Sequence, residues 1–239
     1  MARIGTSGWS YNHWEDALYH GAPDRNRLGF YVREFDTVEL NASFYRWPPA
    51  SRFAAWRERL PPGFEMTVKA PRGLTHARRL LEPDVWIDRI TTGQHELRDR
   101  RGPLILQLPP TLARDDARLH YFLEALPSWT RPVMEFRHDS WTDDAVFALL
   151  ERYGAAYCIM SGAKLPCILR ATAHIVYVRL HGPDAEHLYG GSYSDADLRW
   201  WAERIREWEH AGDTVYAYFN NDGGGNAVRN ARTLKALLT

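Results

Sequence analysis

Three strand-like segments of this chain carry polar side chains on one alternating face, and this pattern is its strongest constraint on the fold. Successive side chains of a β-strand point to opposite faces, so each segment has one apolar and one polar face. A strand buried on both faces normally reads as a continuous apolar run, because an unpaired buried charge is costly. Repetition on several strands predicts a barrel with a polar mouth. The polar residues are Thr37, Glu39 and Asn41; Glu135 and Arg137; and Arg179 and His181.

Eight short segments rich in β-branched or aromatic residues recur along the 239 residues, most of them separated by helical patterns. This alternation is typical of βαβ units and a parallel sheet. Eight strands can close into a barrel, and such barrels commonly occupy about 250 residues. We therefore predict an α/β fold, a TIM-like (β/α)8 barrel forming a single domain over residues 1–239, with an open doubly wound sheet as the alternative. The expected strands are 3–7, 37–41, 64–69, 103–108, 132–137, 155–160, 175–181 and 214–220.

Helical patterns fill most of the gaps between these strands. Thr142 and Ser194 each precede acidic residues, which predicts that they cap the helices that follow. The segment between Met160 and His174 lacks room for a full amphipathic helix, so we expect the sixth βα unit to be degenerate. The expected helices are 51–60, 115–126, 142–153, 194–211 and 227–238.

Composition limits the compartment and the partners. The formal net charge is +0, which gives no general attraction to nucleic acid or membrane. No apolar run reaches the length of a membrane span or signal peptide, so we expect a cytoplasmic protein without a membrane partner. The two cysteines, Cys158 and Cys167, are too few for a disulfide framework, which favours a reducing compartment. Cys158 is expected in the core.

The carboxyl ends of the predicted strands are unusually polar, and barrels of this kind gather their active sites there. Three cations and two carboxylates are expected to share the mouth, where they could hold an anion and move protons. The alternative is a buried ion network that orders the barrel. The strand-end residues are Ser7, Asn41, Lys69, Gln107, Arg137, Ser161, His181 and Asn220, with Glu39, Glu135 and Arg179 two residues deeper.

From these residues we assign expected roles. Glu135 is the preferred general base or acid and Glu39 its partner; His181 would shuttle a proton, and Lys69 would stabilise developing charge. Glu39, Glu135 and His181 could also ligate a divalent metal, but no metal-binding motif fixes their geometry, so a metal is not favoured and the cofactor stays open. The expected substrate-binding residues are Arg137, Arg179, Asn41, Gln107, Asn220, Asn221, Trp9, Tyr45, Trp141, Gly191 and Gly224.

Two glycine-rich stretches follow the seventh and eighth predicted strands. Gly190-Gly191-Ser192 and Gly223-Gly224-Gly225 each precede a predicted helix. Barrels commonly bind phosphate in these two loops through backbone N–H groups and a helix N-terminus. Glycines serve tight turns equally often, so the sequence leaves both interpretations open.

A family resemblance covers nearly the whole chain. Seven motifs occur in order along the sequence: GTSGW from Gly5, ELNASFY from Glu39, KAP from Lys69, LQLPP from Leu106, EFRHDSW from Glu135, VRLHG from Val178 and YFNND from Tyr218. Together they resemble the YecE-like family, catalogued as domain of unknown function 72. The resemblance implies a TIM-like barrel and no particular activity. Endonuclease IV and xylose isomerase-like enzymes have barrels of similar outline, but this chain offers few acidic and histidine ligands at its strand ends.

We weigh three functions. The leading hypothesis is an enzyme that binds a small anionic, phosphate-bearing substrate and carries out acid–base hydrolysis or isomerisation. The second is a nucleic-acid-binding or phosphodiester-processing protein, and the third is a non-catalytic ligand-binding barrel. The second hypothesis depends on base stacking by Trp9, Tyr11, Phe44, Tyr45, Trp47 and Trp141 and on a basic patch of Arg78, Arg79, Arg98, Arg100 and Arg101. The same aromatic residues, like Trp14, are also suited to core packing.

Overall fold

The computed structural model describes residues 1–162 and 164–239, and its eight strands form one sheet in the order β1-β8-β7-β6-β5-β4-β3-β2. An isolated parallel bridge between Ser7 and Glu39 also joins β1 to β2. This is the topology of a TIM-like (β/α)8 barrel, which confirms the predicted fold class. Each predicted strand end lies within two residues of the observed one. The strands are β1 (Ala2–Thr6), β2 (Thr37–Leu40), β3 (Glu65–Lys69), β4 (Arg101–Gln107), β5 (Pro132–Glu135), β6 (Ala156–Ser161), β7 (Ile175–Leu180) and β8 (Thr214–Phe219).

The described residues group into two compact units. Unit 1 contains Met1–Glu39, Ile159–Arg170 and His174–Thr239, and unit 2 contains Leu40–Cys158 and Ala171–Ala173. Unit 1 therefore includes β1, β7 and β8, and unit 2 includes β3, β4 and β5. Strands β2 and β6 each contribute residues to both units.

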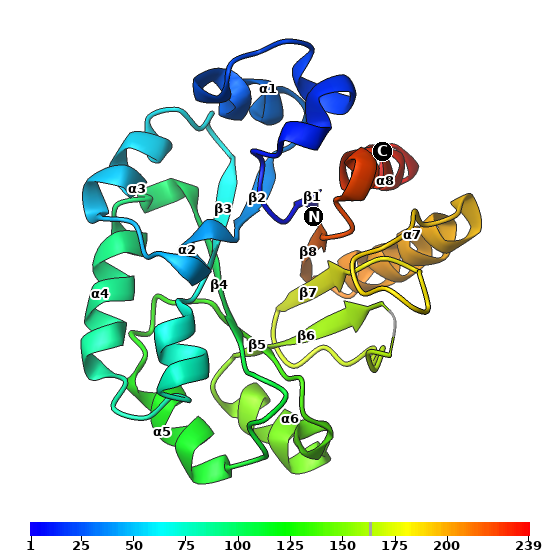
Figure 1. Ribbon diagram of the computed structural model, residues 1–239. Helices are drawn as coiled ribbons and strands as arrows, with labels where there is room; N and C mark the ends of the chain where they lie inside the picture. The colour runs from blue at the N-terminus through cyan, green and yellow to red at the C-terminus, as the bar shows by residue number, and fades with distance from the viewer. Residues whose placement is uncertain (163) are drawn as a thin grey trace. The chain divides into compact units, whose positions relative to one another are not determined.

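In unit 1, helices α7 and α8 contact each other and β8, as Figure 1 shows in orange and red. Helix α7 begins with a capping box: Ser194 accepts a hydrogen bond from the Asp197 backbone N–H, and the Asp197 carboxylate accepts one from the Ser194 backbone. The predicted cap at Ser194 is therefore confirmed. The helical segments are η1 (Asn12–Trp14), η2 (Glu15–Tyr19), η3 (Asp24–Asn26), α1 (Arg27–Glu34), α7 (Asp195–His210), η7 (Gly223–Gly225) and α8 (Asn226–Leu238).

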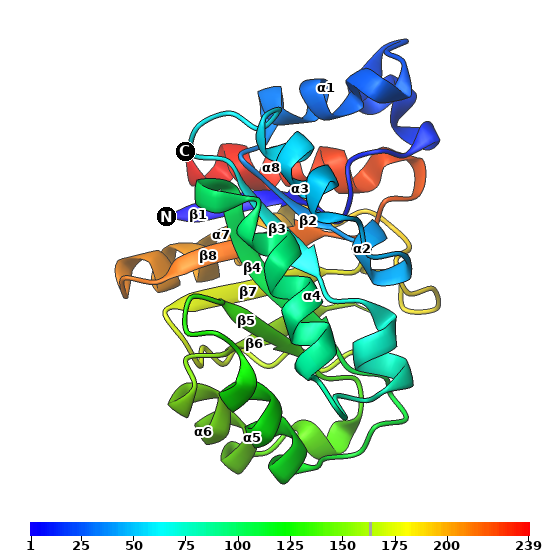
Figure 2. The ribbon, with the colours of Figure 1, turned by 90° about the vertical axis from the view of Figure 1, so that its left-hand side faces the viewer.

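In unit 2, helices α3 and α4 contact each other beside β3 and β4 (Figure 2). Helix α6 starts one position later than expected: Asp143, not Thr142, is the cap, and its side chain accepts a hydrogen bond from the Ala145 N–H at 2.9 Å. The helical segments are α2 (Ala42–Tyr45), α3 (Ala50–Arg57), η4 (Gly73–Ala77), α4 (Asp84–His95), η5 (Arg98–Arg100), α5 (Asp116–Ala125), η6 (Asp139–Trp141) and α6 (Asp144–Arg152).

Two connections differ from, or agree with, the prediction in an informative way. Helices α1 and α4 were not predicted. Helix α1 contains Gly29 and one β-branched residue, and α4 contains Gly93 and several; these lower intrinsic helix propensity, and tertiary packing overrides that preference. Between β6 and β7 no helix occurs in the part of the chain that the structure describes, which confirms the degenerate sixth unit. None of the described helices is both long and apolar enough to cross a membrane.

Candidate functional site

In unit 2, strand register brings three predicted site residues to one face of the sheet. Gln107 of β4 pairs with Glu135 of β5, and Lys69 of β3 pairs with Ile105, two residues before Gln107. Register partners in a parallel sheet point to the same side, and so do residues two apart on one strand. Lys69, Gln107 and Glu135 therefore share a face at the carboxyl ends of β3, β4 and β5.

Glu135 forms a close ion pair with Arg137, which lies just beyond the end of β5. One Glu135 oxygen, Oε1, lies 2.5 Å from both Nε and Nη2 of Arg137. The Glu135 side chain is fully buried and that of Arg137 is 7% exposed. The other oxygen, Oε2, accepts a weak hydrogen bond from Cys158 Sγ at 3.7 Å. Cys158 is buried, as the sequence analysis expected, and it packs directly against this carboxylate.

Lys69 is held by an aromatic ring at the end of β3. Its Nζ lies 4.3 Å from the centroid of the Phe44 ring, and Lys69 as a whole is buried, with 6% of its surface exposed. This is a cation–π contact, which is stronger when the ammonium is removed from water. Ser43 Oγ donates to the Lys69 backbone oxygen at 2.6 Å and so fixes the segment carrying Phe44 to β3.

His76, which the sequence analysis did not select, lies beside this group. Its ring is 5.0 Å from that of Phe44, and Nδ1 lies 2.9 Å from Thr75 Oγ1. Desolvation lowers the pKa of His76 below the ordinary value of 6.5, the positive charges of Lys69 and Arg72 lower it further, and Glu135 opposes them. His76 lies in η4, a single irregular turn, and the sequence of this turn has no periodicity that would identify His76 as a site residue.

We call Lys69, His76, Gln107, Glu135 and Arg137 the Lys69–Glu135 cluster. It contains two basic side chains, one carboxylate and an imidazole whose lowered pKa favours the neutral form at pH 7. One positive charge is therefore in excess. The cluster can attract an anionic group, while the carboxylate and imidazole can accept and donate protons.

In unit 1, Glu39 is the centre of a fully buried hydrogen-bond network. Its carboxylate accepts hydrogen bonds from Ser7 Oγ at 2.6 Å, Tyr177 Oη at 2.6 Å and Arg179 Nη2 at 2.8 Å. Glu39 is 0% exposed and Arg179 is 1% exposed. Burial, followed by the negative charge of Glu39, raises the pKa of Tyr177 well above its ordinary value, so this phenol remains a donor. We call these four residues the Glu39 network.

The remaining strand-end residues of unit 1 form a second polar group. Asn220 Nδ2 lies 3.2 Å from Nδ1 of the buried His181, and Tyr189 lies edge-on to the same imidazole with centroids 5.3 Å apart. Buried Asn221 donates to the backbone oxygen of Gly191 at 3.0 Å. His181 and Asn220 are therefore brought together as their positions at adjacent strand ends predicted, while Asn221 supports the glycine loop.

The glycine loops adopt tight turns. Gly191, Gly224 and Gly225 have φ values of +77°, +60° and +79°, a region that favours glycine. Helix α8 begins at Asn226, directly after Gly225, so the expected loop-to-helix geometry is present. Partial burial raises the pKa of Asp222, the residue before the second glycine run. Its carboxylate would oppose a phosphate at this loop when ionised.

The aromatic residues proposed for stacking are divided by burial. Trp47 and Trp141 are 8% and 1% exposed, so they pack in the core, as does Trp14 at 0%. Trp141 stacks on Phe136 with centroids 4.7 Å apart. The other stacking candidates are at least partly accessible: Trp9, Tyr11 and Phe44 are partly buried, and Tyr45 is 72% exposed.

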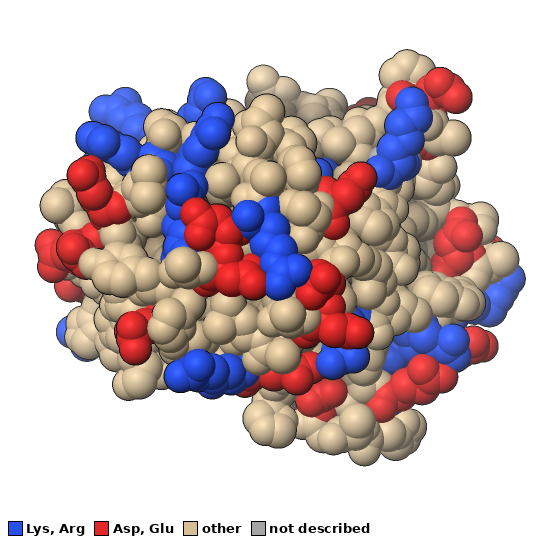
Figure 3. All heavy atoms as spheres, turned by 90° about the horizontal axis from the view of Figure 1, so that it is seen from below, with Lys and Arg blue, Asp and Glu red and all other residues tan. Residues whose placement is uncertain are grey.

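The basic patch is also partly neutralised. Arg78 pairs with Glu82 at 3.4 Å, and Arg100 pairs with Asp99. Figure 3 shows Lys and Arg intermingled with Asp and Glu over the face seen from below. The two ion pairs lower the net positive charge of the patch and therefore its attraction to a nucleic-acid backbone.

Metal-ligating side chains do not converge within residues 1–162 and 164–239: no group of three or more His, Cys, Asp or Glu is placed to hold an ion. Glu39 and Glu135 instead use their oxygens on arginine partners. The structure therefore gives no positive support for the metal-ligand role considered for Glu39, Glu135 and His181.

The fold and the paired strand-end charges define a TIM-like barrel protein with two buried polar clusters. The chain belongs to the family described as "Protein of unknown function DUF72", whose model matches residues 3–239. It is 26% identical to UPF0759 protein YunF of Bacillus subtilis over 100% of this chain and 95% of that protein. It is 31% identical to YecE of Escherichia coli, over 58% of this chain and 49% of that protein.

A solved structure agrees with this assignment. A crystal structure of a DUF72 family protein from Thermotoga maritima has a TM-score of 0.90 and 27% identity, covering 100% of this chain and 99% of that one. The resemblance to the YecE-like family is thereby confirmed.

Proposed function

We propose that this protein is an enzyme that binds a small anionic, phosphate-bearing substrate at the Lys69–Glu135 cluster and carries out acid–base hydrolysis or isomerisation. The supporting observation is the excess of positive charge around a single buried carboxylate. An anionic group of the substrate would balance the net positive charge of the cluster. Location at the carboxyl ends of β3, β4 and β5 agrees with where barrels of this class place their chemistry.

The residues of the cluster have different proposed roles in binding and proton transfer. Lys69 and Arg137 hold the anionic group and stabilise developing negative charge, and Gln107 orients the substrate. Glu135 serves as general base or acid, and His76, neutral at pH 7 because of its lowered pKa, is its partner in proton transfer. Asn41 Oδ1 is buried and accepts no hydrogen bond from the described residues, so it can accept one from a substrate hydroxyl.

Proton transfer is assigned to Glu135 rather than Glu39 because an imidazole, that of His76, lies within the electrostatic influence of Glu135. The Glu39 carboxylate instead accepts hydrogen bonds from Ser7, Tyr177 and Arg179. Glu39 and Arg179 are therefore proposed to hold the strand ends in place. His181, Asn220 and the Gly191 and Gly224 loops remain candidate polar contacts of unit 1, with no step of the reaction assigned to them.

The binding test is a thermal-shift screen of inorganic phosphate and phosphorylated metabolites. We expect at least one compound to raise Tm, and Lys69→Met to weaken its binding about 10-fold or more, since a charge-assisted hydrogen bond is lost. Lys235→Met is the matched control, because Lys235 lies on α8 outside the cluster. A screen in which no phosphorylated compound changes Tm would remove the anionic substrate from the proposal.

The catalytic test separates turnover from binding. Glu135→Gln keeps the shape of the side chain but cannot act as a base, so turnover should be lost while the compound still raises Tm. Equal turnover by the wild type and Glu135→Gln would exclude this residue as the base. A compound that binds wild type tightly but is never converted would identify a ligand-binding barrel instead.

A further inference from the structure

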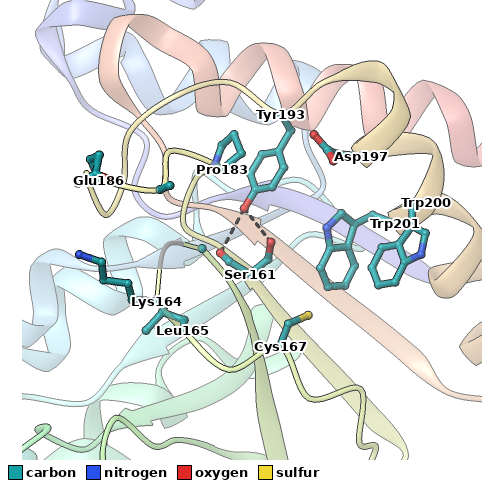
Figure 4. Close-up of a pocket in the computed structure, with 12 residues that line it drawn as sticks. Ser161, Lys164, Leu165, Cys167, Pro183, Glu186, Tyr193, Asp197, Trp200 and Trp201 are labelled. Atoms are coloured by element: carbon teal, nitrogen blue, oxygen red, sulfur yellow. Dashed lines mark hydrogen bonds between the residues drawn. The ribbon is translucent and has the colours of Figure 1, made fainter.

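A separate pocket of about 710 Å³ opens in unit 1 between helix α7 and the segments that follow β6 and β7 (Figure 4). Trp200 and Trp201 of α7 form one wall, and Leu165 and Cys167, after β6, face them. Its volume is in the range of small-molecule sites. No residue of the Lys69–Glu135 cluster is among the described residues that line it, so the pocket is independent of the proposed reaction.

The degenerate sixth unit explains why a pocket occurs here. In a complete (β/α)8 barrel every strand is followed by a helix that packs beside its neighbours. No helix follows β6 in the described part of the chain, and residues 164–167 instead run past α7 without regular structure. The space that a sixth helix would fill is partly left open against the aromatic side chains of α7.

The aromatic wall presents two perpendicular rings. The centroids of Trp200 and Trp201 are 4.9 Å apart and their planes are inclined at 88°. Trp200 is 39% exposed, and the Arg204 guanidinium carbon lies 5.5 Å from its ring centroid, so this indole already attracts one cation. Tyr193 adds a third aromatic side chain, whose hydroxyl is fixed by hydrogen bonds with Ser161 and the Gly182 N–H.

The charges around the pocket also favour a cation. Glu186 and Asp197 contribute two carboxylates and Lys164 one ammonium, so the described lining carries an excess negative charge. The faces of aromatic rings are also electron-rich and attract cations. Leu165, Pro183 and Ala185 provide apolar surface. An anion is disfavoured here, in contrast to the Lys69–Glu135 cluster.

We propose that this pocket binds a small organic cation with apolar substituents, of the quaternary ammonium class. The exposed indole of Trp200 would contact the methyl groups, the accessible edges of the buried Trp201 and Tyr193 would complete the aromatic wall, and Glu186 with Asp197 would balance the charge. Aromatic side chains combined with nearby carboxylates are the usual recognition elements for such ligands.

Cys167 supplies a reporter of occupancy. It lines the pocket and is exposed, whereas Cys158, the other cysteine of the sequence, is buried. Partial desolvation raises the pKa of Cys167, so alkylation by N-ethylmaleimide is best followed above pH 8. A ligand in the pocket should slow this alkylation, and Cys167→Ser should abolish the signal.

The deciding experiment compares choline with 3,3-dimethylbutan-1-ol, its neutral isostere, by protection of Cys167 and by calorimetric titration. We expect choline to protect Cys167 and to bind about 10-fold more tightly than the alcohol. Equal binding of the two compounds would show an apolar pocket without charge preference and would overturn the proposal. Absence of choline binding at 100-fold above the protein concentration and up to about 50 mM would overturn it as well.

Variants locate the binding. Trp200→Leu should weaken choline binding about 10-fold, and Glu186→Gln should weaken it several-fold. Circular dichroism should show that both variants are folded. Trp208→Leu is the matched control on the same helix, because Trp208 is not among the lining residues and should leave binding unchanged. Unaltered choline binding in Trp200→Leu would place the ligand elsewhere and contradict the proposal.

Discussion

Arg179 and Glu39 form an ion pair of 2.8 Å although 140 positions separate them in the sequence. Both side chains are almost completely buried, and Ser7 and Tyr177 complete the hydrogen bonds of the carboxylate. Such a pair offsets its own desolvation only while both partners are present. It therefore ties the end of β2 to β7, two strands that are not neighbours in the sheet.

We expect Arg179→Met to lower the free energy of unfolding by about 3–5 kcal/mol, because it leaves Glu39 buried without its cation. Glu39→Gln should destabilise the protein by a similar amount. The double variant should be less destabilised than the sum of the single variants, since it removes both charges. Urea unfolding of the four proteins measures this coupling, and strictly additive effects would show that the pair contributes no interaction energy.

The strands were predictable from the sequence because their signal is local. The alternation around Glu39 and the apolar runs of β4 and β8 appear within a few neighbouring residues, as does the Ser194 capping pattern. Helices α1 and α4 were missed because their stability depends on packing against the rest of their units rather than on propensity.

The candidate site was predictable in its positions but not in its pairings. Strand ends identified Lys69, Glu135 and Arg137, whereas the contact of Tyr177 with Glu39 joins residues 138 positions apart on two strands that do not pair with each other. His76 gave no periodic signal, since it lies in an irregular turn and acquires its environment only from Lys69 and Phe44. Burial of Trp141 likewise follows from its stacking on Phe136, which the sequence leaves open.

The position of the α6 cap gives a direct test of helix initiation. Asp143 accepts a hydrogen bond from the Ala145 N–H, whereas Thr142 precedes the cap. Asp143→Ala should lower the free energy of unfolding by about 1 kcal/mol, and Thr142→Ala should change it by less than about 0.5 kcal/mol. Equal effects of the two substitutions in urea unfolding would contradict this assignment.

Gly5 is required by close approach of β1 to the backbone of β2. A Cβ at this position would lie 2.4 Å from the Thr37 backbone oxygen, too close for any ordinary contact. Gly5→Ala should therefore destabilise the protein by more than about 2 kcal/mol.

Gly29 in α1 is the matched control, because a Cβ there meets no atom within 4 Å. Gly29→Ala should stabilise the protein by about 0.5–1 kcal/mol through higher helix propensity. Thermal unfolding of the two variants should thus shift Tm in opposite directions, and a Gly5→Ala protein as stable as the wild type would contradict the close approach.

His76 provides the pH test of the Lys69–Glu135 cluster. Desolvation, with the charges of Lys69 and Arg72, lowers its folded-state pKa below the unfolded value near 6.5. Between these two values the unfolded chain binds more protons, so stability should rise with pH through that window and fall as pH decreases. His76→Gln removes the titrating group and should flatten this part of the stability profile.

Lys69→Met should raise the pKa of His76, as measured by NMR titration of the imidazole, because one repelling charge is gone. An imidazole pKa unchanged by Lys69→Met would show that the two residues do not interact, and the charge balance on which the proposed anion binding depends would then have to be abandoned.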